Sequence, residues 1–381
     1  MKDKEIFITG ATGLLGSALV DYLLRNTGYK LHLLIRGSKE EVNKKLKKIM
    51  DFYNLKESNN RLFIHNGDIQ KKRFGINDNE YLTLKKCVTN VVHSAASINL
   101  TQSMEEMRES IELGTRHIIE FCKDVENLEK LEYISTVGVA GNKFKVLYEE
   151  FLDQSGNTFR NNYENVKAQV EQIIYSEIHK GLPITILRPS MVIGNSIDGR
   201  AYKEHVFYFI CDLLSGKLTH YILPKLGNIK IDIIPVDIVA KAIFSSIEKT
   251  EFCGKIFNLS SGKGNIPDIL SLQKEIYKIR KDLLGETKKT IIINASIFWF
   301  LLKIITPFLS ERNKKRIKLL PHLLEYLNFD QEFDNTGFIE SFRVERKTLN
   351  WKEYIKVNIS NYILKSKNTG DAAVKNKNQA I

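Results

Sequence analysis

Short apolar runs alternate with amphipathic stretches along the first half of the chain. Five runs have the composition of buried parallel strands, and each ends in a small or polar residue: EIFITG (5–10), LHLLIRG (31–37), RLFIHNGD (61–68), NVVHSAA (90–96) and LEYISTVG (131–138). Between them, apolar residues recur at helical spacing over residues 13–26, 39–53, 105–125 and 163–178. This alternation predicts an α/β fold, a Rossmann-type doubly wound parallel sheet.

The pattern changes in the second half of the chain. Two further strands are predicted, at LPITILRPS (182–190) and KIFNLSS (255–261). Residues 195–235 and everything after about 262 break the alternation. We therefore expect a Rossmann domain and a smaller, mostly helical C-terminal substrate-binding subdomain. The Rossmann domain would comprise residues 1–194 plus about 232–262, and the subdomain about 195–231 and 263–364.

Composition and charge narrow the class of protein only slightly. The 381 residues are 43% hydrophobic, 10% aromatic and 27% charged, which is an ordinary globular composition, and the net charge is +12. Such a charge suits a solvated surface as well as nucleic acid, an anionic membrane or an acidic partner. Because no zinc knuckle or aromatic RNA-binding pattern occurs, we expect no nucleic-acid partner.

The cysteines and the N-terminus indicate a reducing compartment. Four cysteines lie far apart in the sequence and form no C-x-x-C unit: Cys87, Cys122, Cys211 and Cys253. We therefore expect neither a metal site nor a disulfide. No apolar signal-peptide core precedes the first predicted strand, so a cytoplasmic location is expected. The sequence predicts no oligomeric state.

A glycine cluster joins the first predicted strand to the first predicted helix. In EIFITGATGLLGSALV, Gly10, Gly13 and Gly16 form a G-x-x-G-x-x-G pattern. Glycines let the backbone turn sharply and approach a pyrophosphate, which then lies at the helix N-terminus. The loop predicts a dinucleotide site made of Gly10, Thr12, Gly13, Leu14, Leu15 and Gly16.

Residues at the ends of the next strands indicate which dinucleotide binds. The acid that would hold the ribose 2′-hydroxyl of NAD is absent from LLIRG, where Arg36 stands. Because a guanidinium suits a 2′-phosphate, we expect NADPH as the cofactor of the Rossmann domain. Asp68 and the adjacent Ile69 are expected near the adenine. The small residues that close the fourth strand are expected beside the cofactor: Ser94, Ala95 and Ala96.

A tyrosine four residues before a lysine suggests proton chemistry, and this spacing occurs four times in the chain. Only Tyr163 and Lys167 lie on a predicted helix that follows a strand ending in Thr136. Residues i and i+4 share a helix face, so both side chains can point at one ligand. The remaining pairs lack this context, and we expect them to have a structural role or to lie on the surface: Tyr81/Lys85, Tyr221/Lys225 and Tyr277/Lys281.

Thr136, Tyr163 and Lys167 are therefore the predicted catalytic residues. A phenol with a pKa of about 10 is a poor acid or base at neutral pH, and a nearby ammonium stabilises the phenolate. Tyr163 and Lys167 are also expected to contact the cofactor, because Lys167 can hold the nicotinamide ribose. The Thr136 hydroxyl can donate a hydrogen bond to a substrate carbonyl oxygen.

Taken in order, TGATGLLG, Thr136, the Tyr163/Lys167 pair and LRPSMVIG resemble an extended short-chain dehydrogenase/reductase. NGDIQKKRFGI, VVHSAASINL and IDIIPVDIVAKAI are similar to the thioester reductase and fatty acyl-CoA reductase branch, also called the male-sterility family. The resemblance implies NADPH-dependent reduction of an acyl thioester, on CoA or an acyl or peptidyl carrier protein. The product would be an aldehyde, or an alcohol after a second round. It also implies cofactor contacts by Pro189, Ser190 and Val192.

Two positions depart from the family pattern. Ile111 stands where the family usually has Asn, and Lys45 stands where a second Arg often supports the 2′-phosphate. Lysine keeps the charge but loses the bidentate geometry. Two other functions stay open. One is another extended reductase or epimerase that acts on a nucleotide sugar, a sterol or a free aldehyde. The other is a non-catalytic NADP-binding sensor or scaffold, a class that usually lacks the Tyr or the Lys.

The C-terminal third carries three further features. Residues 291–309, IIINASIFWFLLKIITPFL, form the most apolar window of the chain. A buried helix pair, an acyl-chain channel or lid, and a weak interfacial membrane contact are the three interpretations of this window. The basic run at 312–318 suits a solvated face, CoA phosphates or an acidic carrier protein. The polar end, 365–381, is predicted to be a disordered tail.

Overall fold

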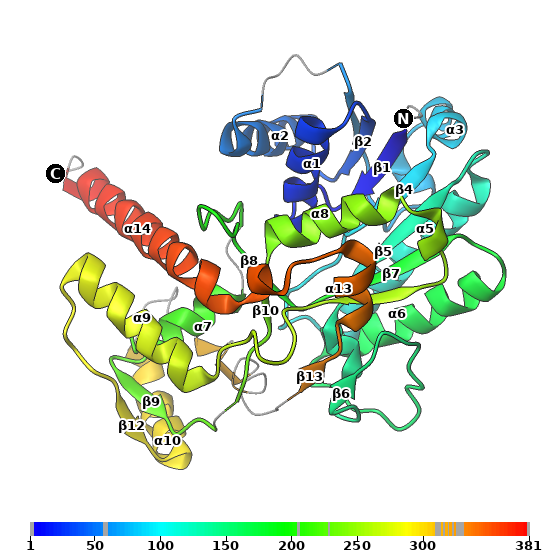
Figure 1. The fold of residues 1–381 in the computed structure, drawn as a ribbon. Helices are drawn as coiled ribbons and strands as arrows, with labels where there is room; N and C mark the ends of the chain where they lie inside the picture. The colour runs from blue at the N-terminus through cyan, green and yellow to red at the C-terminus, as the bar shows by residue number, and fades with distance from the viewer. Residues whose placement is uncertain are drawn as a thin grey trace.

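A seven-stranded parallel sheet forms the centre of the molecule (Figure 1). The computed structural model describes residues 4–55, 60–203, 206–227, 229–308, 314, 317–318, 320–321, 324 and 331–378, with side chains up to residue 366. The strand order is β11-β7-β5-β4-β1-β2-β3. The strands are β1 (Glu5–Thr9), β2 (Lys30–Ile35), β3 (Leu62–Asn66), β4 (Asn90–His93), β5 (Lys130–Ile134), β7 (Ile184–Pro189) and β11 (Ile256–Leu259).

Helices cover both faces of the sheet, as the strand β1 illustrates. Its Ile6 and Ile8 pack into a core with α1 and α8, whereas Phe7 points to the opposite core with α3, α5 and α6. Side chains alternate between the faces of a strand, so both faces of an apolar strand need cover. The predicted doubly wound α/β fold is confirmed. The helices are α1 (Leu14–Asn26), α2 (Lys39–Tyr53), α3 (Asp78–Cys87), α5 (Gly114–Asp124), α6 (Asn162–His179) and α8 (Val236–Ile247).

The winding of the chain reverses between β1 and β4. From β1 the chain moves outward to β2 and β3, and β4 then begins the other half of the sheet on the opposite side of β1. Ligands of open α/β sheets bind at such a switch point, beyond the carboxyl ends of the strands. Here the backbone amide of Ser94 donates to the carbonyl oxygen of Thr9 at 3.3 Å, which joins the two strand ends. The fold thus places the glycine loop at the expected crevice.

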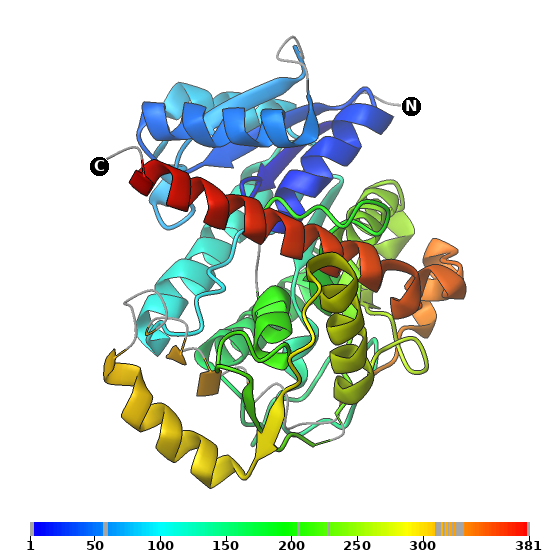
Figure 2. The same cartoon turned by 90° about the vertical axis from the view of Figure 1, so that its left-hand side faces the viewer.

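A second, mostly helical part has a core of its own, beside the sheet (Figures 1 and 2). That core combines α7 (Val206–Leu214), α9 (Ile269–Leu284) and α14 (Trp351–Asn378). Small two-stranded parallel sheets lie outside the large sheet: β8 (Met191–Ile193) with β10 (Ile233–Pro235), and β9 (Ile222–Pro224) with β12 (Ile291–Ile293).

One segment of the predicted subdomain packs against the large sheet instead. It comprises α13 (Thr336–Phe342) and a short 3₁₀ turn (Arg346–Leu349), and it places Phe338 and Leu349 in the same core as α1 and α8. Phe342 packs against Phe252 in a tilted arrangement and against Phe257 edge-to-face, with ring centroids 5.0 and 4.9 Å apart. The exact domain boundaries stay a prediction. This segment falls within the range predicted for the C-terminal subdomain, but its apolar side chains belong to the core of the large sheet.

The last part of the chain differs from the predicted tail. The helix α14 continues to Asn378, so its backbone is helical over most of the region for which we expected disorder. Polar residues such as Lys and Asn cost a helix little, and polarity alone therefore does not distinguish a helix from a tail. Most of the basic run 312–318 lies outside the described residues. None of the helices in the described ranges is long and apolar enough to cross a membrane.

Candidate active site

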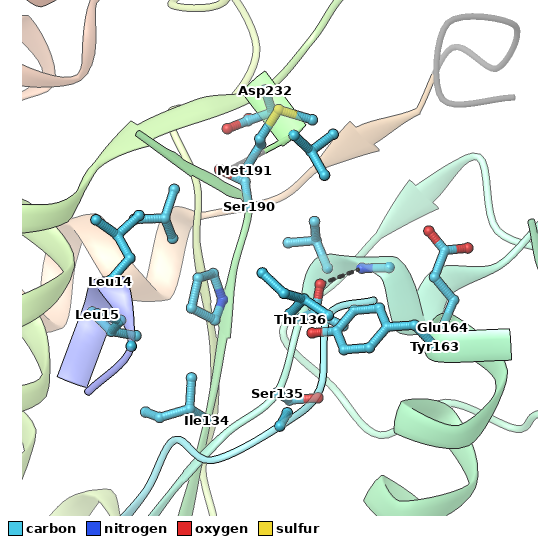
Figure 3. A pocket seen from close by; sticks show the side chains of 18 of the residues that line it. Leu14, Leu15, Ile134, Ser135, Thr136, Tyr163, Glu164, Ser190, Met191 and Asp232 are labelled. Atoms are coloured by element: carbon cyan, nitrogen blue, oxygen red, sulfur yellow. Dashed lines mark hydrogen bonds between the residues drawn. The ribbon is translucent and has the colours of Figure 1, made fainter. Parts of the chain in front are cut away.

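A cavity of about 500 Å³ opens beyond the carboxyl ends of β1, β4, β5 and β7 (Figure 3). Most of the predicted site residues line it: Gly10, Gly13, Leu14, Leu15, Gly16, Ser94, Ala96, Thr136, Tyr163, Pro189, Ser190 and Val192. Six predicted site residues lie outside its lining: Thr12, Arg36, Asp68, Ile69, Ala95 and Lys167. The nucleotide loop and the predicted catalytic hydroxyls therefore share one cavity.

The glycine loop has no room for side chains at two positions. Gly10 has a φ of +75°, and a Cβ added there would lie 2.7 Å from the backbone nitrogen of Ala95. A Cβ on Gly16 would lie 2.2 Å from the carbonyl oxygen of Gly10. Gly13 precedes α1 without a side-chain cap, so the first amides of the helix are available to an anion. This loop fits the pyrophosphate of a dinucleotide.

A buried hydrogen-bond chain holds the ends of β1 and β4 together. Nδ1 of His93 lies 2.7 Å from the Thr9 hydroxyl, and its Nε2 lies 3.0 Å from the Thr115 hydroxyl. Burial, with the charge of Lys167 as a smaller cause, lowers the pKa of His93 to about 3, so the ring is neutral. The histidine thus serves as a neutral connector between strands. Sequence reasoning placed only small residues here and missed this role.

Positive groups gather at the predicted adenosine end. The exposed Arg36 side chain lies 3.8 Å from the Asp68 carboxylate, and Lys45 donates to the carbonyl oxygen of Arg36. From the second part of the molecule, Lys203 also lines the cavity. Burial and then the charge of Lys45 lower the pKa of Lys203. Ile69 contributes its carbonyl oxygen to His117 rather than to the cavity.

Thr136 and Tyr163 lie side by side on the cavity wall that faces Leu14 and Leu15 (Figure 3). Thr136 follows β5, and its hydroxyl accepts a hydrogen bond from the amide of Gly138 at 3.1 Å. Tyr163 stands in the first turn of α6, whose start is fixed by the Asn161 side chain accepting from the amide of Glu164. Burial raises the pKa of Tyr163, so its phenol is protonated at neutral pH. The structure thus places these two side chains next to each other in one cavity.

Lys167 lies outside the cavity lining. Its Nζ donates to the Tyr133 hydroxyl at 2.8 Å and to the carbonyl oxygen of Ile134 at 2.7 Å, and it lies 4.3 Å from the centre of the Tyr133 ring. The side chain is buried, and burial lowers the pKa of Lys167 to about 7, opposed by the charge of Glu171. The described contacts of this ammonium are to β5, and the contact with the cofactor ribose stays a prediction.

A buried ion pair joins α6, the helix that carries Tyr163, to the strand β7. The Arg188 guanidinium on β7 pairs with the Glu171 carboxylate on α6, with an Nε to Oε1 distance of 3.0 Å. Glu171 also accepts from the hydroxyl of Ser135, the neighbour of Thr136, at 2.5 Å. The network therefore ties α6, β5 and β7 together one turn beyond Lys167. Sequence reasoning missed it, although an arginine inside the apolar strand TILRPS was a visible signal.

The remaining wall of the cavity is mainly apolar. Met191, Val206, Ile210 and Phe333 are among its side chains, and Lys230 adds a cation. The buried Asp232 carboxylate also lies here, and it accepts from the amides of Ser261 and Gly262 at 2.9 and 3.0 Å. Burial raises the pKa of Asp232. Its backbone bonds give this carboxylate a structural role.

One group of side chains in the described ranges has the geometry of a metal site. Donor atoms of Glu5, His32 and Cys87 lie within 4.8 Å of one another. They lie at the amino end of β1, at the edge of the sheet opposite the cavity. Glu5 is already paired with Lys30 at 2.7 Å and with His32 at 2.9 Å. Hydrogen bonds within the chain thus account for the cluster, and it forms no part of the active site.

Comparison with known families identifies the fold and its lineage. A family model described as "Male sterility protein" matches residues 8–243, which is more than half of the chain. The chain belongs to the male sterility protein family. This confirms the resemblance inferred from the motifs, and the matched range contains every predicted site residue.

Two curated relatives illustrate the range of this family. The chain is 27% identical over 269 residues to the nonribosomal peptide synthetase asaC of Aspergillus flavus, covering 68% of this chain and 26% of the relative. It is 28% identical over 289 residues to the fatty acyl-CoA reductase wat of Drosophila melanogaster, covering 64% and 54%. The chain thus spans about half or less of the length of these relatives.

Solved structures share the fold. The terminal R domain from the myxalamid PKS-NRPS biosynthetic pathway superposes with a TM-score of 0.77 at 22% identity, covering 95% of this chain and 91% of that chain. A UDP-glucuronic acid 4-epimerase from Bacillus cereus, in complex with NAD, gives a TM-score of 0.63 at 18% identity. It covers 94% of this chain and 99% of that chain.

The position of the usual family Asn has an unusual backbone in this member. Ile111 lies in a π-helical segment, Arg108–Leu113, between α4 (Met104–Met107) and α5. Such segments are frequent at functional sites. The Ile111 side chain is buried in the core, and its carbonyl oxygen accepts from the Thr115 hydroxyl at 2.7 Å. Neither the side chain nor the carbonyl oxygen of Ile111 therefore takes the place of the Asn side-chain amide at the site.

Proposed function

We propose that this protein is an NADPH-dependent reductase of acyl thioesters. The observation that carries the proposal is the shared cavity, which has the glycine loop on one side and the Thr136 and Tyr163 hydroxyls on the other. Family membership supports it, since the relatives include fatty acyl-CoA reductases and nonribosomal peptide synthetases.

NADPH fits the residues present. The tight backbone of Gly10 and Gly16 leaves room for a pyrophosphate, and Arg36 supplies a guanidinium for the 2′-phosphate. Lys45 and Lys203 add positive charge at the same end. When bound, the cofactor supplies the hydride that reduces the thioester carbonyl carbon.

The chain supplies the proton and the stabilisation of negative charge. As the carbonyl oxygen gains charge, the hydroxyls of Thr136 and Tyr163 donate hydrogen bonds to it, and Tyr163 transfers its proton. The resulting hemithioacetal loses its carbon–sulfur bond, which gives an aldehyde and a free thiol. Lys167 donates to the buried Tyr133, and its positive charge, one turn along α6 from Tyr163, would favour the phenolate that forms.

The substrate side of the cavity suits an acyl group on a phosphate-bearing arm. Apolar side chains such as Met191 and Ile210 can cover an acyl chain, while Lys230 offers a cation to a phosphate. Both CoA and a phosphopantetheine-bearing carrier protein have such a phosphate. We therefore propose an acyl thioester on one of these two carriers as the substrate.

A screen of acyl-CoA chain lengths with NADPH tests the proposal. We expect NADPH oxidation together with free thiol, measured with a thiol-reactive dye, and a product identified by mass spectrometry. One NADPH should be oxidised per thiol where the product is an aldehyde, and two where it is an alcohol. NADPH oxidation without thiol release would indicate a free-aldehyde or ketone reductase. Turnover of a nucleotide sugar without net NADPH loss would indicate an epimerase, and either result would overturn the proposal.

A further inference from the structure

The segment from Lys288 to Phe308 exposes an unusual amount of apolar surface. Six of its side chains define what we call the α10 patch: Ile291, Ile292, Ile297, Phe300, Ile304 and Phe308. Phe308 is 86% exposed and Phe300 is 64% exposed, although large apolar residues are normally covered. The patch lies on β12, on α10 (Ala295–Ile305) and on the 3₁₀ turn Thr306–Phe308.

The packing of α10 explains why the patch is uncovered. Only Phe298 and Leu302, one turn apart on the same side of the helix, are buried. Ile297, Phe300 and Ile304 follow the i, i+3, i+7 spacing and form a stripe on another side. Figures 1 and 2 show α10 at the outer end of the molecule, remote from the large sheet. The helix is thus apolar on a face that the described chain leaves open.

Charge around the patch is of one sign. Residues 287–310 contain no Asp or Glu, whereas Lys288, Lys289 and Lys303 are all exposed. On α10, Lys303 stands beside the apolar stripe, and the two other lysines precede β12. An apolar surface surrounded by lysines is complementary to a layer with an apolar interior and negatively charged groups on its outside.

We propose that the α10 patch binds the surface of an anionic lipid bilayer. Its apolar side chains would lie among the headgroups and upper acyl chains, and the three lysines would contact lipid phosphates. A second copy of this chain fits less well, because a two-fold interface would bring the lysines of both copies together. A protein partner normally adds about ten hydrogen bonds across its interface, whereas the segment 291–308 exposes few polar side chains for them: Asn294, Ser296 and Lys303.

Vesicle binding tests this proposal without any turnover measurement, so it is independent of the proposed function. The full chain is mixed with vesicles of phosphatidylcholine alone or with an equal share of phosphatidylglycerol, and bound protein is measured by flotation. Each lysine near an anionic surface adds roughly a factor of five in binding. The three lysines together predict roughly 100-fold stronger binding to the anionic vesicles, weakened by salt.

Variants locate the contact. Phe300→Glu with Phe308→Glu should abolish vesicle binding, and replacing Lys288, Lys289 and Lys303 by Gln should remove the preference for anionic lipid. The control is Leu82→Glu, which changes a side chain on α3 that is 50% exposed and should leave binding unchanged. Circular dichroism and NADPH binding of each variant show that it is folded.

Trp299, which is 38% exposed beside the patch, gives a second readout. Its fluorescence should shift to the blue on addition of anionic vesicles, and Trp299→Phe should remove that shift. The proposal is overturned if the wild type does not float with vesicles, or if the double glutamate variant floats equally well. It is also overturned if the patch instead mediates self-association or capture of a carrier protein with no affinity for lipid.

Discussion

Removing one buried hydroxyl should change the pH dependence of the reaction. The Lys167 ammonium donates to the Tyr133 hydroxyl at 2.8 Å and to the carbonyl oxygen of Ile134 at 2.7 Å. Tyr133→Phe removes the first of these acceptors and keeps the ring. Tyr133 and Lys167 are 0% and 2% exposed, so water does not readily replace the lost hydroxyl.

The size of the effect follows from the hydrogen bond that is lost. Burial already lowers the pKa of Lys167 to about 7, and the Tyr133 acceptor stabilises the charged form. A hydrogen bond to a charged group contributes about 1.5 to 3 kcal/mol, and about 1.4 kcal/mol corresponds to one pKa unit. The variant should therefore have a Lys167 pKa that is lower by at least about one unit.

The direction in which the pH profile shifts depends on which protonation state of Lys167 is active. If its ammonium supports proton transfer from Tyr163, activity falls as pH rises through the pKa of Lys167. In Tyr133→Phe that fall should begin at least about one pH unit lower, with little change in the KM for NADPH. The assay is kcat for thioester reduction measured across neutral pH.

A matched control separates this effect from general damage. Tyr148→Phe makes the same chemical change at a ring that is 53% exposed, and it should leave the profile unchanged. An unaltered pH profile in a folded Tyr133→Phe protein would refute the idea that Tyr133 sets the charge of Lys167. A shift toward alkaline pH would contradict the direction of the reasoning.

Three other predictions concern stability and cofactor binding. Arg188→Met strands the buried charge of Glu171 and should lower the free energy of unfolding in urea by about 3–5 kcal/mol. Adding Glu171→Leu should recover most of it, and no recovery would argue against the ion pair as the cause. Gly10→Ala forces a Cβ to 2.7 Å from backbone and should weaken NADPH binding, measured by fluorescence titration, about 100-fold or more; wild-type affinity would contradict the cradle. Arg36→Asp should raise the KM for NADPH about tenfold or more and spare NADH; an equal rise for both would place Arg36 away from the 2′-phosphate.

Much of the Rossmann part could be predicted because its signals are local. A near-continuous apolar strand such as EIFIT needs cover on both faces, and a glycine loop between strand and helix has few other uses. Thr136 and Tyr163 could be assigned to one site because Thr136 directly follows β5 and Tyr163 lies on the next long helix, α6. These features depend on short stretches of sequence.

The features that sequence missed depend on contacts between distant segments. Lys167 turns to Tyr133 because β5 and α6 pack closely, which the Tyr-x-x-x-Lys spacing does not reveal. The pairing of Arg188 with Glu171 likewise requires β7 to lie under α6. The exposure of α10 could not be inferred either, since apolar composition does not tell which faces of a helix find a partner.

The central claim is that Tyr163 protonates a thioester oxygen in the shared cavity. The most direct test is a single-turnover reaction of NADPH and an acyl-CoA with wild type and Tyr163→Phe, following NADPH and free thiol together. We expect one thiol per NADPH in the wild type. In Tyr163→Phe the rate should fall by about 10²–10⁴-fold, while the affinity for NADPH stays nearly unchanged. Undiminished thiol release by Tyr163→Phe would contradict it.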